Sequence, residues 1–210
     1  MVLDNDLIVA NLMKQTQFGE SAGMPVLKSI HNAIEERGGS QTLLEEVSRQ
    51  LDDEARHILV YAGVLENERF NVKKAVSPQW RAFMEYARSN KSSLGSSVAA
   101  IYGVIEPFNK LALEDLILPK LDRTELRLVN EVLNDEKRHL EILEAFEDSC
   151  GSTLTEQDRS SALQTVFFFV ETFKDGVDID GVGKVHFSTS AKWEFLRDVR
   201  KTIRRIESWA

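Results

Sequence analysis

Hydrophobic residues recur along most of this chain at intervals of three and four positions, which is the spacing of one face of an α-helix. Only four prolines occur in 210 residues, so long helices are permitted. We therefore expect an all-α protein. The pattern predicts long helices over residues 4–37, 41–68, 94–118, 125–148, 156–174 and 190–208, and a shorter one within residues 71–92.

The first predicted helix contains three residues that disfavour helix continuity. Gly19, Gly23 and Pro25 lie in its interior. Proline removes a backbone N–H donor, and its ring clashes with the carbonyl one turn back. We therefore expect this helix to kink or break near these residues.

The C-terminal part of the chain holds one very apolar helix and one polar connection. Residues Val166–Val170 read Val-Phe-Phe-Phe-Val, which is too apolar to face water. Residues 175–189 are rich in glycine and aspartate, and this composition predicts a loop.

Composition and charge narrow the class of protein. The net charge of −8 makes nucleic acid an unlikely partner, because phosphate binding needs clustered lysine and arginine. No apolar run approaches the roughly 20 residues that span a membrane. The N-terminus is acidic where a signal peptide would be basic. The lone cysteine, Cys150, fits a reducing compartment, so we expect a cytoplasmic globular protein.

The motif Asp-Glu-x-Arg-His occurs twice, beginning at Asp53 and, eighty-two residues later, at Asp135. Both copies lie in predicted helices, and residues three apart share a helix face. Each copy therefore presents a carboxylate and an imidazole side by side. These pairs are Glu54 with His57 and Glu136 with His139.

Two further carboxylates follow from the turns between the predicted helices, because residues equally distant from the turn of a helical hairpin lie at the same height. Counting back from the Gly-Gly turn leads to residues 20–23, in which Glu20 is the sole carboxylate. Counting back from the turn near Leu121 leads to residues 104–107, which contain Glu106 alone. Glu106 has apolar neighbours, where a carboxylate is costly unless it is paired or metal-bound.

The ordered pattern Glu, Glu-x-x-His, Glu, Glu-x-x-His resembles the ferritin-like di-iron carboxylate superfamily over roughly residues 5–148. The resemblance implies a ferritin-like four-helix bundle with a long crossover, followed here by two additional C-terminal helices. We expect a single domain over residues 1–210, with the bundle in 1–150 and a helical extension in 151–210 packed on it. The implied ligands of two iron ions, with manganese as an alternative, are Glu20, Glu54, His57, Glu106, Glu136 and His139.

The residues that flank these positions extend the resemblance. In members of the superfamily that activate oxygen, the aspartate of the motif supports a ligand histidine from outside the metal site. By resemblance, Asp53 would hold His139 and Asp135 would hold His57. The arginines of the two motifs could pair with these aspartates, or they could be exposed charges on the backs of the helices. These arginines are Arg56 and Arg138.

Tyr61 lies four residues after His57 and seven after Glu54, so it shares their helix face. This offset matches the radical tyrosine of the small subunit of ribonucleotide reductase, which the motif also resembles. The chain is much too short for that subunit, and an ordinary core tyrosine is the alternative.

The form of the motif favours an O₂-dependent di-iron oxygenase or oxidase that acts on a small organic molecule. Such an enzyme could need an external reductant and could be a homodimer. One alternative is a ferroxidase, iron-handling or peroxide-scavenging protein similar to ferritins and rubrerythrins. Another is a tRNA-modifying hydroxylase, suggested by the basic residues of the last predicted helix, such as Arg200 and Arg204.

Overall fold

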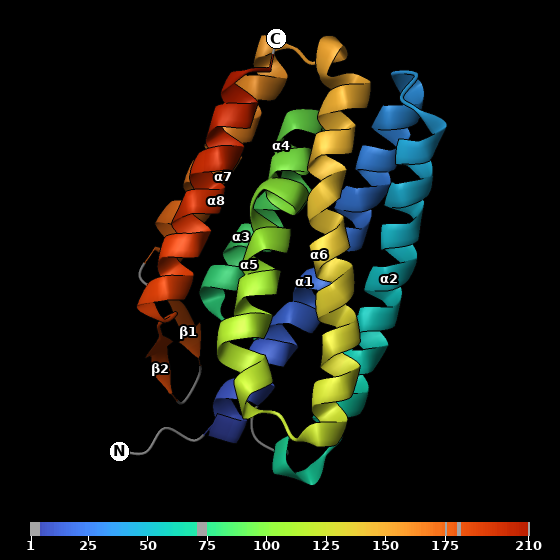
Figure 1. Cartoon of the computed structure of the whole chain (residues 1–210). Helices are drawn as coiled ribbons and strands as arrows, with labels where there is room; N and C mark the ends of the chain where they lie inside the picture. Colours follow the sequence, from blue (N-terminus) through green and yellow to red (C-terminus); the bar gives the residue numbers. More distant parts are fainter. Residues whose placement is uncertain (1–4, 71–74, 175, 180–181, 210) are drawn as a thin grey trace.

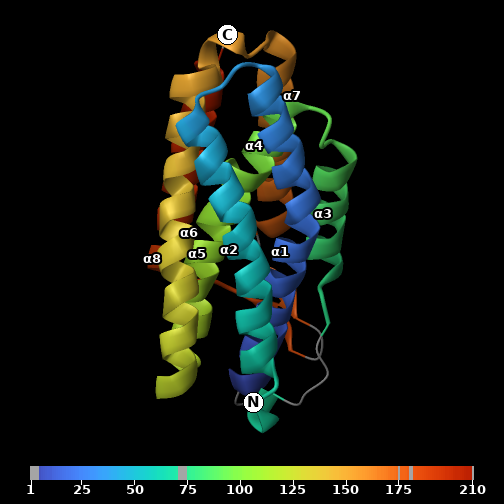
Figure 2. The same ribbon diagram turned by 90° about the vertical axis from the view of Figure 1, so that its right-hand side faces the viewer.

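Four long helical segments lie side by side and form the body of the protein (Figures 1 and 2). The computed structural model describes residues 5–70, 75–174, 176–179 and 182–209. The predicted all-α class is confirmed. The four segments are α1 (Asn5–Glu36), α2 (Gln41–Leu65), residues 94–120 and α6 (Arg123–Cys150).

Shorter elements surround this body. The connection from α2 to residue 94 contains α3 (Pro78–Ser89), which packs against α1. Two C-terminal helices, α7 (Glu156–Phe173) and α8 (Thr189–Glu207), pack against each other and against the segment 94–120. Short 3₁₀ turns occupy Glu68–Phe70, Leu118–Lys120 and Gly151–Thr153.

At the starts of several helices, a side chain accepts hydrogen bonds from backbone N–H groups that have no partner inside the helix. Asp122 accepts from the N–H groups of Thr124 and Glu125, and the Glu125 side chain accepts from the Asp122 N–H in return, forming a capping box at the start of α6. At the starts of α2, α3, α4 (Leu94–Val98) and α8, a serine hydroxyl accepts one backbone N–H of the helix. These caps are Ser40, Ser77, Ser93 and Ser188.

α1 continues through the residues at which the sequence predicts an interruption. The prediction was a kink or a break at Gly19, Gly23 and Pro25, and the break was wrong, because Pro25 lies inside the continuous helix. Val26, Leu27 and other residues of this stretch are buried against the neighbouring helices. Tertiary packing therefore outweighs the local preference of proline and glycine.

The segment 94–120 is a helix of changing pitch. α4 passes into a π-helical stretch, Ala99–Ile105, which is followed by α5 (Glu106–Ala112) and a second π-helical stretch, Leu113–Ile117. Pro107 has no N–H to donate to the carbonyl of Gly103, four residues earlier. The hydroxyl of Thr202 on α8 donates to that carbonyl at 3.3 Å. The last helix thus satisfies a backbone group next to Glu106.

In the chain, a small antiparallel sheet follows α7 and precedes α8. β1 (Val177–Ile179) pairs with β2 (Gly183–Val185), and Val177 faces Val185 in the register. The prediction of a loop over residues 175–189 was therefore wrong for these six residues. Residues 175, 180 and 181 of this segment lie outside the described part of the chain.

The apolar run of α7 is only partly buried. Val166 and Phe169 are buried, whereas Phe167 is 54% exposed and Phe168 is 36% exposed. Five consecutive helical residues cover every side of a helix, so some of them must point outward. The prediction that the whole run avoids water was wrong for these two phenylalanines. Within the described residues, no helix combines the length and apolar character that a membrane crossing requires.

Two buried glycines differ in the space around them and predict opposite effects on stability. A Cβ on Gly95 would collide with the backbone carbonyl of Asp158 on α7, whereas one on Gly23 would meet only the side chain of Ile101 at an ordinary 3.7 Å. We expect Gly95→Ala to lower the free energy of unfolding by about 1–3 kcal/mol. Gly23→Ala should raise it by up to about 1 kcal/mol.

Urea unfolding followed by circular dichroism measures both free energies. Equal stability of the Gly95→Ala variant and the parent chain would show that α4 and α7 do not approach each other this closely.

Candidate metal centre

Six acidic and imidazole side chains meet in the interior between the four long helical segments. α1 supplies one carboxylate, α2 and α6 each supply a carboxylate and an imidazole, and the first residue of α5 supplies the fourth carboxylate. All six are at most 5% exposed. The structure therefore brings together every residue that the sequence suggests as a ligand: Glu20, Glu54, His57, Glu106, Glu136 and His139.

These side chains form two adjoining groups, each able to hold a metal ion. In each group the ligand atoms lie within 4.8 Å of one another. The first group contains Glu20, Glu54, His57 and Glu136, and the second contains Glu54, Glu106 and His139.

Three carboxylates surround the Nδ1 atom of His57. Its distances are 3.4 Å to Oε2 of Glu54, 3.7 Å to Oε1 of Glu136 and 4.0 Å to Oε1 of Glu20. Nδ1 therefore faces the carboxylate oxygens of three different helices.

The Nδ1 atom of His139 has a matching environment. It lies 3.6 Å from Oε1 of Glu54, 3.6 Å from Oε2 of Glu106 and 4.0 Å from Oε2 of Glu136. Glu54 and Glu136 thus each turn one oxygen toward each histidine. Glu20 approaches only His57 in this way, and Glu106 approaches only His139. Two carboxylates occupy bridging positions and two occupy end positions.

The inward-facing atoms of this cluster lack hydrogen-bond partners. Among the described residues, both histidine Nδ1 atoms and at least one oxygen of each carboxylate are buried without a partner. Such atoms are costly to bury, and a bound cation would satisfy several of them at once. The unpartnered atoms fit metal coordination.

The outward nitrogens of the histidines contact the aspartates of the two motifs. Nε2 of His57 lies 3.3 Å from Asp135, and Nε2 of His139 lies 3.4 Å from Asp53. An aspartate accepts hydrogen bonds, so these contacts favour the tautomer with the proton on Nε2 and a lone pair on Nδ1. Each aspartate comes from the opposite motif, as the resemblance implies.

The two arginines of the motifs tie the aspartates together. Arg56 contacts Asp53 at 2.9 Å and Asp135 at 2.5 Å. Arg138 contacts Asp135 at 2.8 Å and also pairs with Asp53. Burial acts to raise the pKa of Asp53, but hydrogen bonds from His139 and Arg56 and the charge of Arg138 hold the pKa far below its usual value. Asp53 is therefore ionised.

Burial and mutual repulsion change the acidity of the inner groups. Burial and the charge of Glu106 raise the pKa of Glu136 well above its usual value, and they also raise the pKa of Glu54. Burial acts to raise the pKa of Glu106, but the adjacent Glu136 and His139 side chains lower it. Burial opposes the charge of His139, but Asp53 and Glu106 raise its pKa to about 10. Without a cation, the cluster therefore retains protons at neutral pH.

Gln50 is a member of the site that sequence analysis missed. Its side chain is fully buried, and Nε2 donates to Oε1 of Glu54 at 2.9 Å and to Oε1 of Glu106 at 2.7 Å. Gln50 joins a bridging carboxylate to an end carboxylate. Its position four residues before Glu54 on one helix face was the available signal.

Two buried tyrosines lie near the carboxylates. The hydroxyl groups of Tyr61 and Tyr102 have no hydrogen-bond partner among the described residues. Burial raises the pKa of Tyr61 well above its usual value, and the charges of nearby Glu136 and Glu54 add to this effect. The same causes, burial and the charge of Glu106, raise the pKa of Tyr102. Both phenols are therefore neutral, and the negative charges of the nearby carboxylates disfavour their ionisation.

The free space beside the carboxylates is very small. A cavity of about 10 Å³ lies against Glu20, Glu54 and Glu106, with Gly19 and Gly23 in its wall. This volume corresponds to about one water-sized molecule.

Comparisons of the chain with family models, curated proteins and solved structures found no match. The interpretation of the site therefore rests on the geometry and chemistry of its own residues.

The pKa values predict that metal binding releases protons. His139, whose pKa is raised to about 10, is protonated at neutral pH in the metal-free protein and must lose a proton before Nδ1 can bind a cation. The raised pKa of Glu136 also favours its protonated form, which a cation would displace. The apparent affinity for Mn²⁺ should therefore rise from pH 6 to pH 8.

Calorimetry in buffers of different ionisation enthalpy counts the protons released. A metal affinity that stays constant over this pH range, with no proton release, would contradict the predicted protonation of the cluster.

Gln50 should affect metal affinity through the two carboxylates that it holds. We expect Gln50→Leu to weaken Mn²⁺ binding about 10-fold or more, because loss of an outer hydrogen bond commonly costs this much. Gln17→Leu on α1 is a control, since Gln17 donates to the backbone carbonyl of Ile58 and not to the cluster. Equal Mn²⁺ affinity of both variants in a competition titration would show that Gln50 does not orient the site.

Proposed function

We propose that this chain is a di-iron or di-manganese oxidoreductase of the ferritin-like type, which activates O₂ to oxidise or hydroxylate a small organic substrate. The observation that carries the proposal is the bridging arrangement. Glu54 and Glu136 each present one oxygen to His57 and one to His139. Two bridging carboxylates, two end carboxylates and two imidazoles form the ligand set of dinuclear sites in four-helix bundles.

Charge balance supports two divalent ions. Four ionised carboxylates carry four negative charges, and two divalent cations with neutral histidines bring the sum to zero. A buried cluster with four uncompensated charges would be very unfavourable. Carboxylate and imidazole ligands without sulfur suit iron and manganese. Cys150, the single cysteine, lies near the far end of α6 from the turn at Asp122 and is absent from the metal-binding groups.

When bound, a pair of ferrous ions supplies the electrons with which dioxygen is reduced. The residues of this chain contribute the geometry and the surroundings. Asp135 contacts His57 and Asp53 contacts His139, and these contacts fix the tautomers of both histidines. Gln50 holds the carboxylates of Glu54 and Glu106 in place. Leu27 and Ile101 in the wall of the small cavity keep the space beside Glu20 apolar. In this proposal, the neutral phenol of Tyr61 is the candidate for a redox-active side chain.

A second function, ferroxidase activity, is favoured by the size of the free space. The cavity of about 10 Å³ beside the carboxylates has room for about one water-sized molecule and none for an organic substrate. If no helix moves, ferrous iron itself would be the substrate that is oxidised. The oxygenase requires the bundle to open near Gly19 and Gly23, whereas the ferroxidase does not.

Metal content tests the dinuclear proposal. Chelator-free protein loaded anaerobically with Fe²⁺ should hold about two ions per chain and should consume O₂ on exposure. We expect Glu106→Gln to retain about one ion and to consume O₂ at least about 10-fold more slowly, because an end ligand is lost. Glu114→Gln is the matched control, since Glu114 is partly exposed and pairs with Lys110 and Lys137.

A parent chain that binds fewer than two ions, or that binds two without reacting with O₂, would overturn the proposal. The oxygenase and the ferroxidase differ in the number of Fe²⁺ equivalents that they oxidise, and an iron-storing protein also differs in the size of its assembly. A ferroxidase should oxidise many equivalents of Fe²⁺ without an organic substrate, and an iron-storing assembly should appear as a large oligomer in light scattering.

A further inference from the structure

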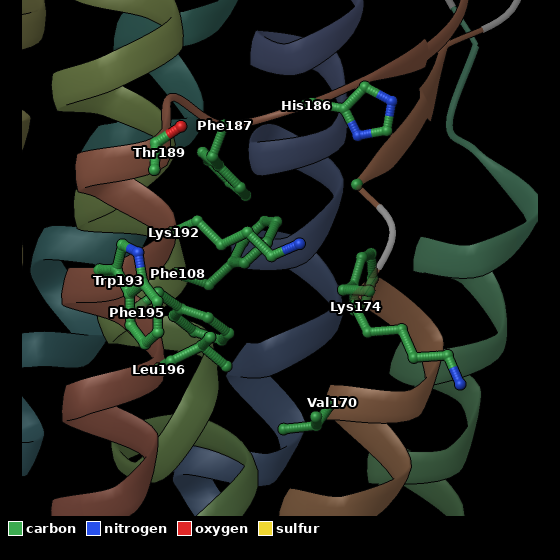
Figure 3. Close-up of a pocket in the computed structure, with 12 residues that line it drawn as sticks. Phe108, Val170, Lys174, His186, Phe187, Thr189, Lys192, Trp193, Phe195 and Leu196 are labelled. Atoms are coloured by element: carbon green, nitrogen blue, oxygen red, sulfur yellow. The ribbon is translucent and has the colours of Figure 1, made fainter.

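A pocket of about 620 Å³ lies between the two C-terminal helices, well within the size range of small-molecule sites (Figure 3). Its walls come from the end of α7, the segment after β2 and the first half of α8, with one residue of α5 as the floor. The metal-centre proposal makes no use of this pocket.

The interior of the pocket is aromatic. Phe108 forms the floor, and its ring centre lies 5.2 Å from that of Phe173, 5.4 Å from that of Phe187 and 6.0 Å from that of Phe195. Trp193 also lines the pocket and is 62% exposed. Phe187 and Phe195 meet Phe108 edge to face, whereas the ring of Phe173 is tilted against it, and such rings offer the same contacts to an aromatic ligand.

The ionisable side chains that line the pocket are basic. Lys174, Lys192 and His186 belong to the lining, which contains no carboxylate among the residues that the structure describes. Lys174 pairs with Glu171 at 2.6 Å. Lys192 forms no ion pair within the described part of the chain, and Figure 3 shows it extending from α8 toward the middle of the pocket. An anion bound against the aromatic walls would therefore find one lysine to pair with.

We propose that this pocket binds an aromatic monocarboxylate. The aromatic body packs among Phe108, Phe187 and Phe195, and the carboxylate pairs with the ammonium group of Lys192. The ligand class follows from a pocket with aromatic walls and a positive rim in a chain whose net charge is −8. A cation would meet Lys192 directly, and a ligand without charge would leave the lysine unpaired.

The pocket is distinct from the metal centre. Phe108 follows Glu106 by two residues, and two residues correspond to about 200° around a helix. Glu106 faces the carboxylate cluster, while Phe108 faces the opposite side of α5. Binding in the pocket therefore does not rest on the proposed function and can be tested on metal-free protein.

Three probes that share one body test the charge preference: 4-phenylbutyrate, 4-phenylbutanol and 4-phenylbutylamine. Calorimetry should show that the acid binds most tightly and the amine least. An exposed lysine favours an anion by up to about fivefold, so Lys192→Gln should bring the affinities of acid and alcohol together. Lys201→Gln on the same helix is the control, because Lys201 pairs with Asp198 at 3.4 Å.

Tryptophan fluorescence tests the location. The acid should change the emission of the parent chain, and Trp193→Phe should lose most of this change while calorimetry still detects binding. The proposal is overturned by the absence of saturable binding, by equal affinity for acid and alcohol in the parent chain, or by an acid preference that survives Lys192→Gln. A full fluorescence response in Trp193→Phe would place the ligand elsewhere and would also overturn it.

Discussion

The burial of four carboxylates around two imidazoles is the constraint on which the rest of the structure depends. Glu54 and Glu136 lie between His57 and His139, at distances of 3.4–4.0 Å from their Nδ1 atoms. A protein interior tolerates such a cluster only with protons or cations to balance its charge. The raised pKa values of Glu54, Glu136 and His139 are the response of the metal-free protein. A metal pair would replace those protons.

The surroundings hold the cluster in this form from several sides. Asp53 and Asp135 fix the outer nitrogens of the histidines, and Gln50 connects two of the carboxylates on the inside. The π-helical stretch before Glu106 and the missing N–H of Pro107 leave a carbonyl at Gly103, to which α8 supplies a hydroxyl. Part of the C-terminal extension therefore supports the helix that carries an end carboxylate.

The positions of the candidate ligands follow from the sequence where the period of the α-helix constrains which residues share a face. Residues three apart share a face and hairpin partners share a height, so the sequence alone locates the repeated motif and the mirrored Glu20 and Glu106. The rest depended on tertiary contacts. α1 passes through Pro25 because its faces are buried, and β1 pairs with β2 inside a segment whose composition predicts a loop. The contact of Gln50 with Glu106 appears only when the two helices are placed side by side.

The two cavities differ in size and lie at different places in the fold, and this difference bears on both proposals. The space at the carboxylates, about 10 Å³, is too small for an organic molecule, while the pocket of about 620 Å³ lies on the other side of α5. An oxygenase would need its substrate at the first of these positions, so its activity would require a movement of α1 or of the π-helical stretch near Glu106. A ferroxidase would need no such movement, because only iron and O₂ would have to reach the carboxylates. The aromatic pocket could then serve a ligand that never meets the metals.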